Sequence, residues 1–138
     1  MTRLFKAKGV EYSVGACDDD LRARGDAERI TQICINLLSN ALKATSSGGR
    51  VDVDCDADES SVSIHVHDTG VGIPPERIEA VFSPFTQLGR ALNSPDTGVG
   101  LGLAISRELA RVMSGDVTVV SEVGVGSTFT LVLPRAMR

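Results

Sequence analysis

The chain has 138 residues, which fits a single domain with one sizeable core. Its net charge of -4 excludes a broad nucleic-acid surface, because proteins that follow a phosphate backbone are usually basic. Residues 2–8 lack the apolar run of a signal peptide, and no apolar stretch approaches the roughly 20 residues that span a bilayer. We therefore expect a cytoplasmic chain without direct membrane contact; an anchor of the parent protein would lie outside this sequence.

The first predicted elements are a short strand and a long helix. Val10, Tyr12 and Val14 alternate with polar neighbours and predict the strand. The helix is expected at about residues 27–45, with Asp26 as its N-cap and the Ser46–Gly49 run as its end.

The second half of the chain mixes strands with helices. The expected elements are strands at 51–55 and 62–66 in a hairpin, a short helix at 75–81, a helix at 101–113, and strands at 117–121 and 128–133. Residues 72–100 form a long proline-broken stretch, and such loops in a compact domain are usually lids or disordered. We expect an α+β fold, with helices layered on one face of a sheet.

The three cysteines, Cys17, Cys34 and Cys55, are odd in number and fit neither a zinc site nor a disulfide framework. Cys34 lies in an apolar helical pattern, where a cysteine acts as a small buried hydrophobe. We therefore expect free thiols in a reducing compartment.

The long helix is predicted to carry a narrow polar stripe. At about 100° per residue, five side chains fall within roughly 40° of one line: Arg29, Gln32, Asn36, Asn40 and Lys43. On an isolated helix such a stripe would simply face solvent. Asparagine, however, is a poor helix former when it is merely solvated. Two amides and an ammonium group on one face can instead hold a hydrated cation and its phosphates.

Asp68 continues the apolar alternation of the strand before it, so its carboxylate is predicted to face the core, where an unpaired charge is costly. A buried acceptor at that place suits a donor such as an exocyclic amine. Gly70 and Gly72 let the backbone approach a flat ligand closely. Taken alone, the same residues are equally compatible with an ordinary turn.

Two further glycine-rich segments suggest ligand contacts. Gly98, Gly100 and Gly102 open the second long helix, where free amides and the positive end of the helix dipole form an anion site. This run is neither a Walker A loop nor a dinucleotide fingerprint, and alone it also fits a hinge. After the Gly124–Gly126 turn, Thr128 can offer a hydroxyl to a ligand.

Taken in order, these four segments resemble the N, G1, G2 and G3 boxes of sensor histidine kinase ATP-binding domains. Those domains belong to the GHKL group, with gyrase-type, chaperone and mismatch-repair ATPases. Residues 36–45 (NLLSNALKAT) match the N box, and residues 82–87 (FSPFTQ) resemble the F box. The resemblance covers about residues 10–134. It implies a two-layer α/β sandwich of the Bergerat type, with a mixed sheet of about five strands and about three helices on one face.

The resemblance implies roles in binding ATP and Mg²⁺. Asn40 would give its side-chain oxygen to Mg²⁺ and Lys43 would contact the phosphates, as the catalytic pair. Asp68 would accept from the adenine amino group. The other implied nucleotide-binding residues are Asn36, Gly70, Gly72, Ile73, Gly98, Gly100, Leu101, Gly102 and Thr128. Phe82 and Phe85 would be lid anchors or, equally, ordinary core residues.

Asn36 distinguishes two branches of this group. The ATP-hydrolysing members carry a glutamate at that position as the base that activates water, and an asparagine cannot act as a general base. The resemblance therefore implies phosphoryl transfer, which needs mainly positioning and charge neutralisation. We interpret the chain as part of a protein histidine kinase.

The phosphoacceptor of the family lies on a helix of a separate dimerisation domain. His65 and His67 both have the outward parity of their strand, so neither fits that role. We therefore expect residues 1–9 to be a residual linker from a missing dimerisation domain and residues 10–138 to be the catalytic domain. Such a chain is not expected to autophosphorylate alone.

The leading hypothesis is a domain that binds Mg·ATP and phosphorylates a histidine of the dimerisation domain of the same full-length protein, with a response regulator downstream. A GHKL ATPase or a serine-phosphorylating anti-sigma-type kinase is the first alternative. A nucleotide-sensing module without catalysis is the second.

Overall fold

A computed structural model describes residues 2–15, 27–78, 80–82 and 97–135, with side chains in the last helix described from Leu103 onward. In chain order the elements are α1 (Thr2–Lys8), β1 (Glu11–Val14), α2 (Ala27–Ala44), β2 (Arg50–Ala57), β3 (Ser61–Asp68), the 3-10 helices η1 (Pro75–Arg77) and η2 (Ala80–Phe82), α4 (Thr97–Val112), β4 (Asp116–Glu122) and β5 (Gly126–Pro134).

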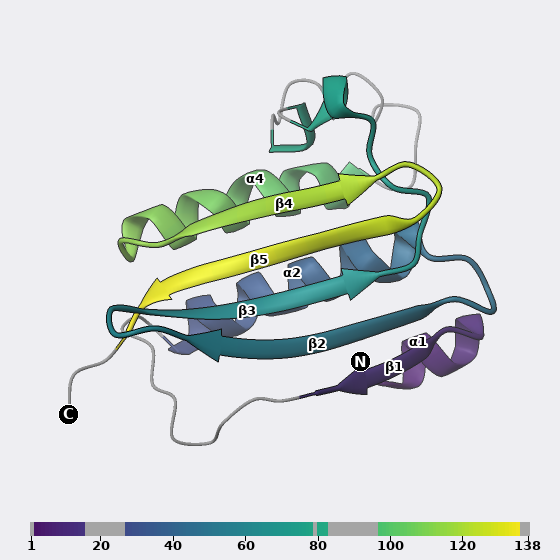
Figure 1. Cartoon of the computed structure of the whole chain (residues 1–138), viewed down its shortest axis with the longest axis horizontal. Helices are drawn as coiled ribbons and strands as arrows, with labels where there is room; N and C mark the ends of the chain where they lie inside the picture. The colour runs from purple at the N-terminus through teal and green to yellow at the C-terminus, as the bar shows by residue number, and fades with distance from the viewer. Residues whose placement is uncertain (1, 16–26, 79, 83–96, 136–138) are drawn as a thin grey trace.

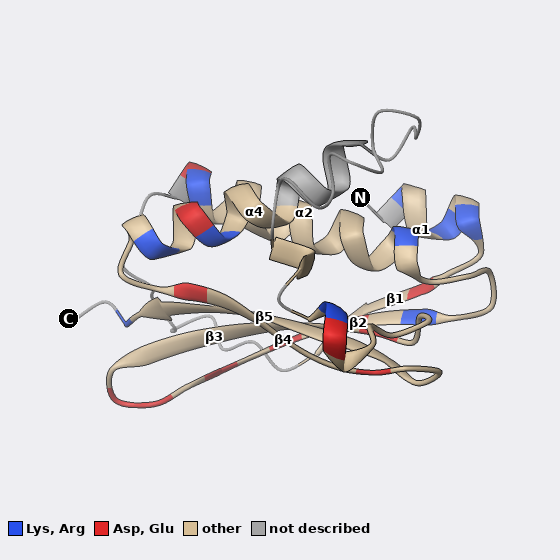
Figure 2. Ribbon diagram, turned by 90° about the horizontal axis from the view of Figure 1, so that it is seen from above, with Lys and Arg blue, Asp and Glu red and all other residues tan. Residues whose placement is uncertain are grey.

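The strands form one mixed sheet in the order β1-β2-β3-β5-β4 (Figure 1). β1 pairs with β2 in parallel, and the other three pairings are antiparallel. The three α-helices of the described chain all lie on one face of this sheet (Figure 2). The expected α+β, two-layer architecture and the expected hairpin of β2 and β3 are both confirmed.

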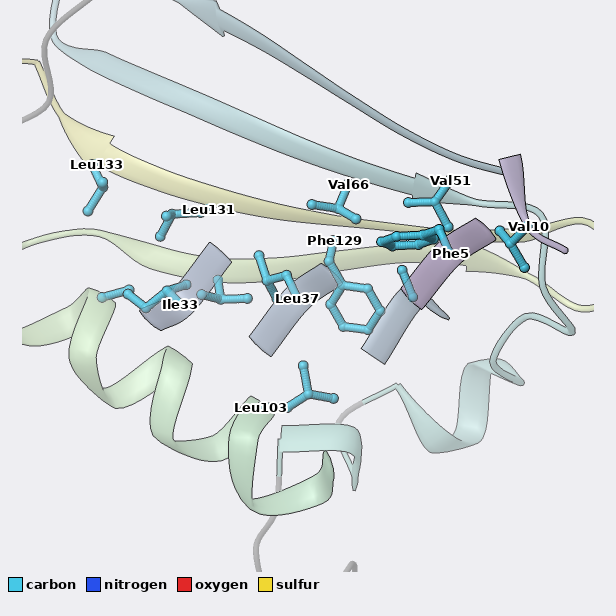
Figure 3. Close-up of a cluster of buried hydrophobic side chains, with 13 residues drawn as sticks. Phe5, Val10, Ile33, Leu37, Val51, Val66, Leu103, Phe129, Leu131 and Leu133 are labelled. Atoms are coloured by element: carbon cyan, nitrogen blue, oxygen red, sulfur yellow. The ribbon is translucent and has the colours of Figure 1, made fainter. Parts of the chain in front are cut away.

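The core fills the space between this helical layer and the sheet. α2 contributes Ile33 and Leu37, and α4 contributes Leu103. Val66 of β3 and Phe129 of β5 face them from the sheet (Figure 3). Burial of each such side chain stabilises the fold by about 1.5–3 kcal/mol. The core thereby fixes α2 over β3 and β5, and α4 over β4 and β5.

The segment expected to be a linker contains α1, which packs against the domain. Phe5 is buried at 1% exposure and its ring stacks on Tyr12, with centroids 4.7 Å apart. Lys8 Nζ donates a hydrogen bond to the carbonyl oxygen of Leu42 (2.7 Å), close to the end of α2. Seven residues are too few to show a helical period, so the sequence pattern did not reveal this helix. A preceding dimerisation domain stays a prediction.

Two helices differ from expectation. The expected helix at 75–81 is present as the two 3-10 turns η1 and η2, and Pro75 occupies the first position of η1. α4 begins at Thr97 rather than at Leu101, so the glycines lie inside its first turns. Glycine costs about 1 kcal/mol in a helix relative to alanine, which is why the pattern placed the start too late. No helix in the described ranges is long and apolar enough to cross a membrane.

The expectation of free thiols is wrong for Cys55. This residue of β2 is disulfide-bonded, and its partner lies outside the described residues. Cys34 is a free thiol on α2, and burial raises the pKa of that thiol. Spacing along the chain cannot reveal a pair that only the fold brings together.

Candidate functional site

The candidate site lies at the end of the sheet where three strands meet. β3 ends and β5 begins there with Asp68 opposite Ser127, and Ser121 of β4 lies opposite Ser127 on the other side. Figure 1 shows the arrowheads of β3 and β4 at this same end. A hollow of about 390 Å³ opens there, lined by Asp68, Val120, Ser121, Glu122, Val125, Gly126, Ser127 and Thr128.

Asp68 is a buried carboxylate that is only half satisfied. The residue is 6% exposed, and its Oδ1 accepts a hydrogen bond from the Gly70 N–H (2.8 Å). Its Oδ2 is buried and has no hydrogen-bond partner among the described residues. Burial raises the pKa of Asp68, against the opposing effect of the Gly70 and Ser127 backbone N–H groups. A buried acceptor without a donor is costly, so a ligand with an N–H group would be favoured here.

Glycines let the surrounding loops close on Asp68. A Cβ on Gly126 would overlap the carbonyl oxygen of Asp68, and one on Gly72 would overlap that of Glu122. Gly72 also has a φ of 78°, which favours glycine. A Cβ on Gly70 would overlap the carbonyl oxygen of Ala44, the last residue of α2. The end of α2 is therefore held against the Asp68 loop.

α2 brings three of the predicted residues toward this end. Asn36 and Asn40 are half-buried and Lys43 is exposed. Asn36 Nδ2 donates a hydrogen bond to Ser106 Oγ (3.1 Å) on α4, and Ser106 is fully buried. Asn36 thus joins α2 to α4, whereas Lys43, directly before Ala44, is exposed.

The glycine segment of α4 lies at the same end of the molecule. Gly98, Gly100, Leu101 and Gly102 belong to the first turns of the helix, where only their backbone is described. α4 is about 24 Å long and β4 about 23 Å, and residues 113–115 join them at the opposite end. The N-terminus of α4, with its positive dipole end, therefore comes back to the end of β4.

Ile73 and Phe82 fasten the described residues that follow β3 to the rest of the domain. The Ile73 N–H donates to Ser121 Oγ (2.7 Å), and its side chain packs on the core. The Phe82 ring meets Phe129 edge to face at 6.3 Å, while the Arg107 guanidinium lies 4.4 Å from its centre. Phe82 is therefore packed against the core; Phe85 lies outside the described residues.

Thr128 lines the hollow, but its hydroxyl faces away from Asp68. Thr128 Oγ1 hydrogen-bonds to His67 Nδ1 (2.9 Å) on the face of the sheet opposite the helices, as expected for an outward histidine. Ser127 instead lies opposite Asp68 and is 7% exposed. The alternation of buried residues along β5 contained this signal, because Ser127 shares the parity of Phe129.

One family model matches this chain over most of its length. The model described as "Histidine kinase-, DNA gyrase B-, and HSP90-like ATPase" matches residues 25–137. The chain belongs to this ATPase family. Within the family it is similar to sensor histidine kinases, so a gyrase-type ATPase is not favoured.

RcsC, a sensor histidine kinase of Salmonella typhimurium, is 47% identical over 117 residues, which are 85% of this chain and 12% of RcsC. The structure of full-length ShkA in complex with AMPPNP covers 100% of this chain with a TM-score of 0.84 and 32% identity. This chain spans 28% of ShkA. The nucleotide-free catalytic domain of ThkA has a TM-score of 0.80 and 27% identity, covering 96% of this chain and 83% of that one. The chain thus spans a small part of the full-length kinases that it matches.

Proposed function

We propose that this chain is the ATP-binding catalytic domain of a two-component sensor histidine kinase. It binds Mg·ATP and transfers the γ-phosphoryl group to a histidine on the dimerisation domain of the same full-length protein, which acts as a dimer. The observation that carries the proposal is the buried Asp68 Oδ2 without a partner, inside an ATPase-family fold. The exocyclic amine of adenine supplies the donor that this oxygen lacks.

The glycines support a flat base beside Asp68. The contacts of Gly72 and Gly126 leave no room for a side chain where the loops close on the carboxylate. Gly70 and Ile73 complete the surroundings of the base, and Thr128 lines the hollow beside them although its hydroxyl lies on the other side of the sheet. At the other end of the ligand, Gly98, Gly100, Leu101 and Gly102 face the phosphates from the first turns of α4.

α2 supplies the groups that meet Mg²⁺ and phosphate. No group of three or more His, Cys, Asp or Glu in the described chain is placed to hold a metal ion. Mg²⁺ commonly binds through few protein oxygens together with substrate phosphates, and one amide oxygen from Asn40 fits that pattern. The ion would neutralise charge on the transferred group. Lys43 adds a positive charge on the exposed side of the same helix.

Transfer, rather than hydrolysis, follows from the residue one turn before Asn40. Asn36 cannot remove a proton from water, and its amide already donates to Ser106. In the transfer, the bond from the γ-phosphorus to the β,γ-bridging oxygen breaks, a phosphorus–nitrogen bond forms on the acceptor histidine, and ADP leaves. His65 and His67 are held on the opposite face of the sheet, so the acceptor must come from another domain.

The wider assignment follows from this chemistry. A response regulator would take the phosphoryl group from the histidine, as the next step of a phosphorelay. We place the domain in the cytoplasm, where ATP is supplied, and propose no nucleic-acid partner. Residues 1–9 connect it to the dimerisation domain in this proposal.

An Asn40→Ala variant separates binding from transfer. With a matching histidine-bearing dimerisation domain supplied in trans, labelled ATP should phosphorylate that domain, giving an acid-labile product. Asn40→Ala should reduce transfer at least about 100-fold while ATP binding falls far less, because one metal ligand is lost but the base site remains. Gln32→Ala, on the same stripe two turns earlier, is the matched control and should keep full transfer.

Three results would contradict the proposal. Equal transfer by Asn40→Ala and by the unchanged chain would remove the role of Asn40. Steady ATP turnover by the chain alone would show an ATPase. Binding of ATP without transfer to any supplied acceptor would favour a nucleotide-sensing module.

A further inference from the structure

Ser121 forms a hydrogen-bonded junction beside the candidate base pocket. Its Oγ accepts from the Ile73 N–H (2.7 Å), donates to the Gly126 carbonyl oxygen (3.0 Å) and lies 2.7 Å from Ser127 Oγ. These partners lie on the loop after β3 and on β5. One hydroxyl on β4 therefore joins both glycine loops that surround Asp68.

The number of hydroxyl hydrogens determines which of Ser121 and Ser127 donates in the bond between them. A serine hydroxyl has one hydrogen and two lone pairs. If Ser121 donated to Ser127, its contact with the Gly126 oxygen would hold no hydrogen and would be repulsive. All three contacts are bonds only when Ser121 donates to Gly126 and Ser127 donates to Ser121. The Ser127 hydrogen is then used, and Ser127 Oγ can only accept.

At this point of the pocket wall, the side chains of Asp68 and Ser127 consequently present acceptors alone. Ser127 lies directly opposite Asp68 in the sheet register, both residues are buried, and both line the same hollow. Asp68 Oδ2 is an acceptor without a donor. Two acceptors side by side favour an amino group and repel a carbonyl oxygen, because an unpaired buried polar group is costly.

We propose that Ser121 is a positioning residue that sets the base specificity of this site. Because Ser121 accepts the Ser127 hydrogen, the site binds purines with an amine at position 6 and disfavours those with an oxygen there. This inference rests on the proposed ATP-binding function and goes beyond it, since it assigns discrimination to a residue that acts through the Ser127 hydroxyl.

ATP and ITP test this directly, because they differ only at position 6 and in the hydrogen on the neighbouring ring nitrogen. Their affinities are measured by calorimetry with Mg²⁺ on the whole chain. Ser121→Ala releases the Ser127 hydroxyl, which can then donate to the oxygen of ITP. We expect the ATP-to-ITP affinity ratio to fall roughly fivefold, the worth of one hydrogen bond, mostly through tighter ITP binding.

Three variants control this experiment. Ser121→Thr restores the hydroxyl and should restore the ratio. Thr118→Ala removes a hydroxyl from the outer side of the same strand and should leave the ratio unchanged. In a Ser121→Ala, Ser127→Ala double variant, the gained ITP affinity should disappear. If Ser121→Ala does not fold, Ser121→Cys replaces it, because a thiol is a weak hydrogen-bond partner and should lower the ratio in the same direction.

If Ser121 had only a structural role, its replacement would weaken the binding of ATP and of ITP by the same factor. An unchanged ratio in Ser121→Ala, or in Ser121→Cys, therefore overturns the inference while leaving ATP binding intact. Failure of the unchanged chain to bind ATP would instead overturn the proposed function, which keeps the two failures distinguishable.

Discussion

The hairpin of β2 and β3 carries aspartates on both of its faces, and their carboxylates differ in whether they have hydrogen-bond partners. On the outer face Asp54 Oδ2 bonds His67 Nε2 (2.9 Å), and the same ring bonds Thr128. The same series of hydrogen bonds recurs two residues along the strands, where His65 joins Asp56 and Thr130. On the helical face Asp68 Oδ2 has no such partner in the described structure. The outer carboxylates are satisfied within the protein, whereas Asp68 Oδ2 is satisfied only by the base in the function that we propose.

Of these variants, we expect Asp68→Asn to have the largest effect on ATP affinity. The amide puts a donor where the adenine amine also donates, so ATP affinity should fall at least about 100-fold by calorimetry. The nucleotide-free protein should meanwhile melt at a higher temperature at pH 7, because a buried charge has been removed.

Asp54→Asn is the matched control on the same hairpin and should leave ATP affinity unchanged. If both variants bind ATP as well as the unchanged chain, Asp68 is not the base acceptor.

Gly126→Ala tests how tightly the loops must close. Its Cβ would overlap the Asp68 carbonyl oxygen at a φ of 145°, so we expect a loss of roughly 3 kcal/mol in the free energy of unfolding, measured with urea. Gly124→Ala is the control: its φ is 83°, but nothing lies within 4 Å of the added Cβ, and about 1 kcal/mol is expected. Equal losses would mean that backbone angle, not packing, requires these glycines.

Acidification should weaken ATP binding through Asp68. The pKa of Asp68 is raised by burial, so its carboxylate protonates at a higher pH than an exposed one and stops accepting from the base. ATP affinity should therefore decline as pH falls toward that raised pKa. The stability contribution has the opposite sign: protonation relieves the buried charge, so this group favours folding more as pH falls.

Titration of ATP affinity against pH measures the first effect, and Asp54→Asn should leave the curve in place. A curve that does not change between pH 7 and the usual aspartate range would separate ATP binding from the Asp68 charge.

His67→Ala should have the smallest effect. The hydrogen bond between Asp54 and His67 is half exposed, and exposed contacts of this kind contribute at most about 1 kcal/mol. Thermal melting should show a small loss, with ATP affinity unchanged. A large fall in affinity would show that the outer face communicates with the site.

Much of the fold could be predicted because its periods are long and regular. The 3.6-residue period of α2 and the alternation in β2 and β3 predicted their bounds to within a few residues and the inward direction of Asp68. The start of α4 could not be predicted, because its packing against α2 and β4 outweighs the helix penalty of several glycines.

The rest of the site depends on contacts between distant residues. The glycine-rich turn predicted Thr128 rather than Ser127 as the site residue, although the parity of β5 distinguishes them. Ser121 had no local signal, since its bond to Ile73 joins residues 48 positions apart. Asn36 and Ser106 are 70 positions apart, and no local pattern relates them.

α1 has a mechanical consequence. Phe5 anchors it in the core, and Lys8 Nζ holds the Leu42 carbonyl on the helix that carries Asn40. These two contacts, at Phe5 and at Lys8, leave α1 little freedom to move relative to α2. A twist or pull applied at residue 2 is therefore passed to the last turns of α2 as displacement, or it must first break one of the two fastenings.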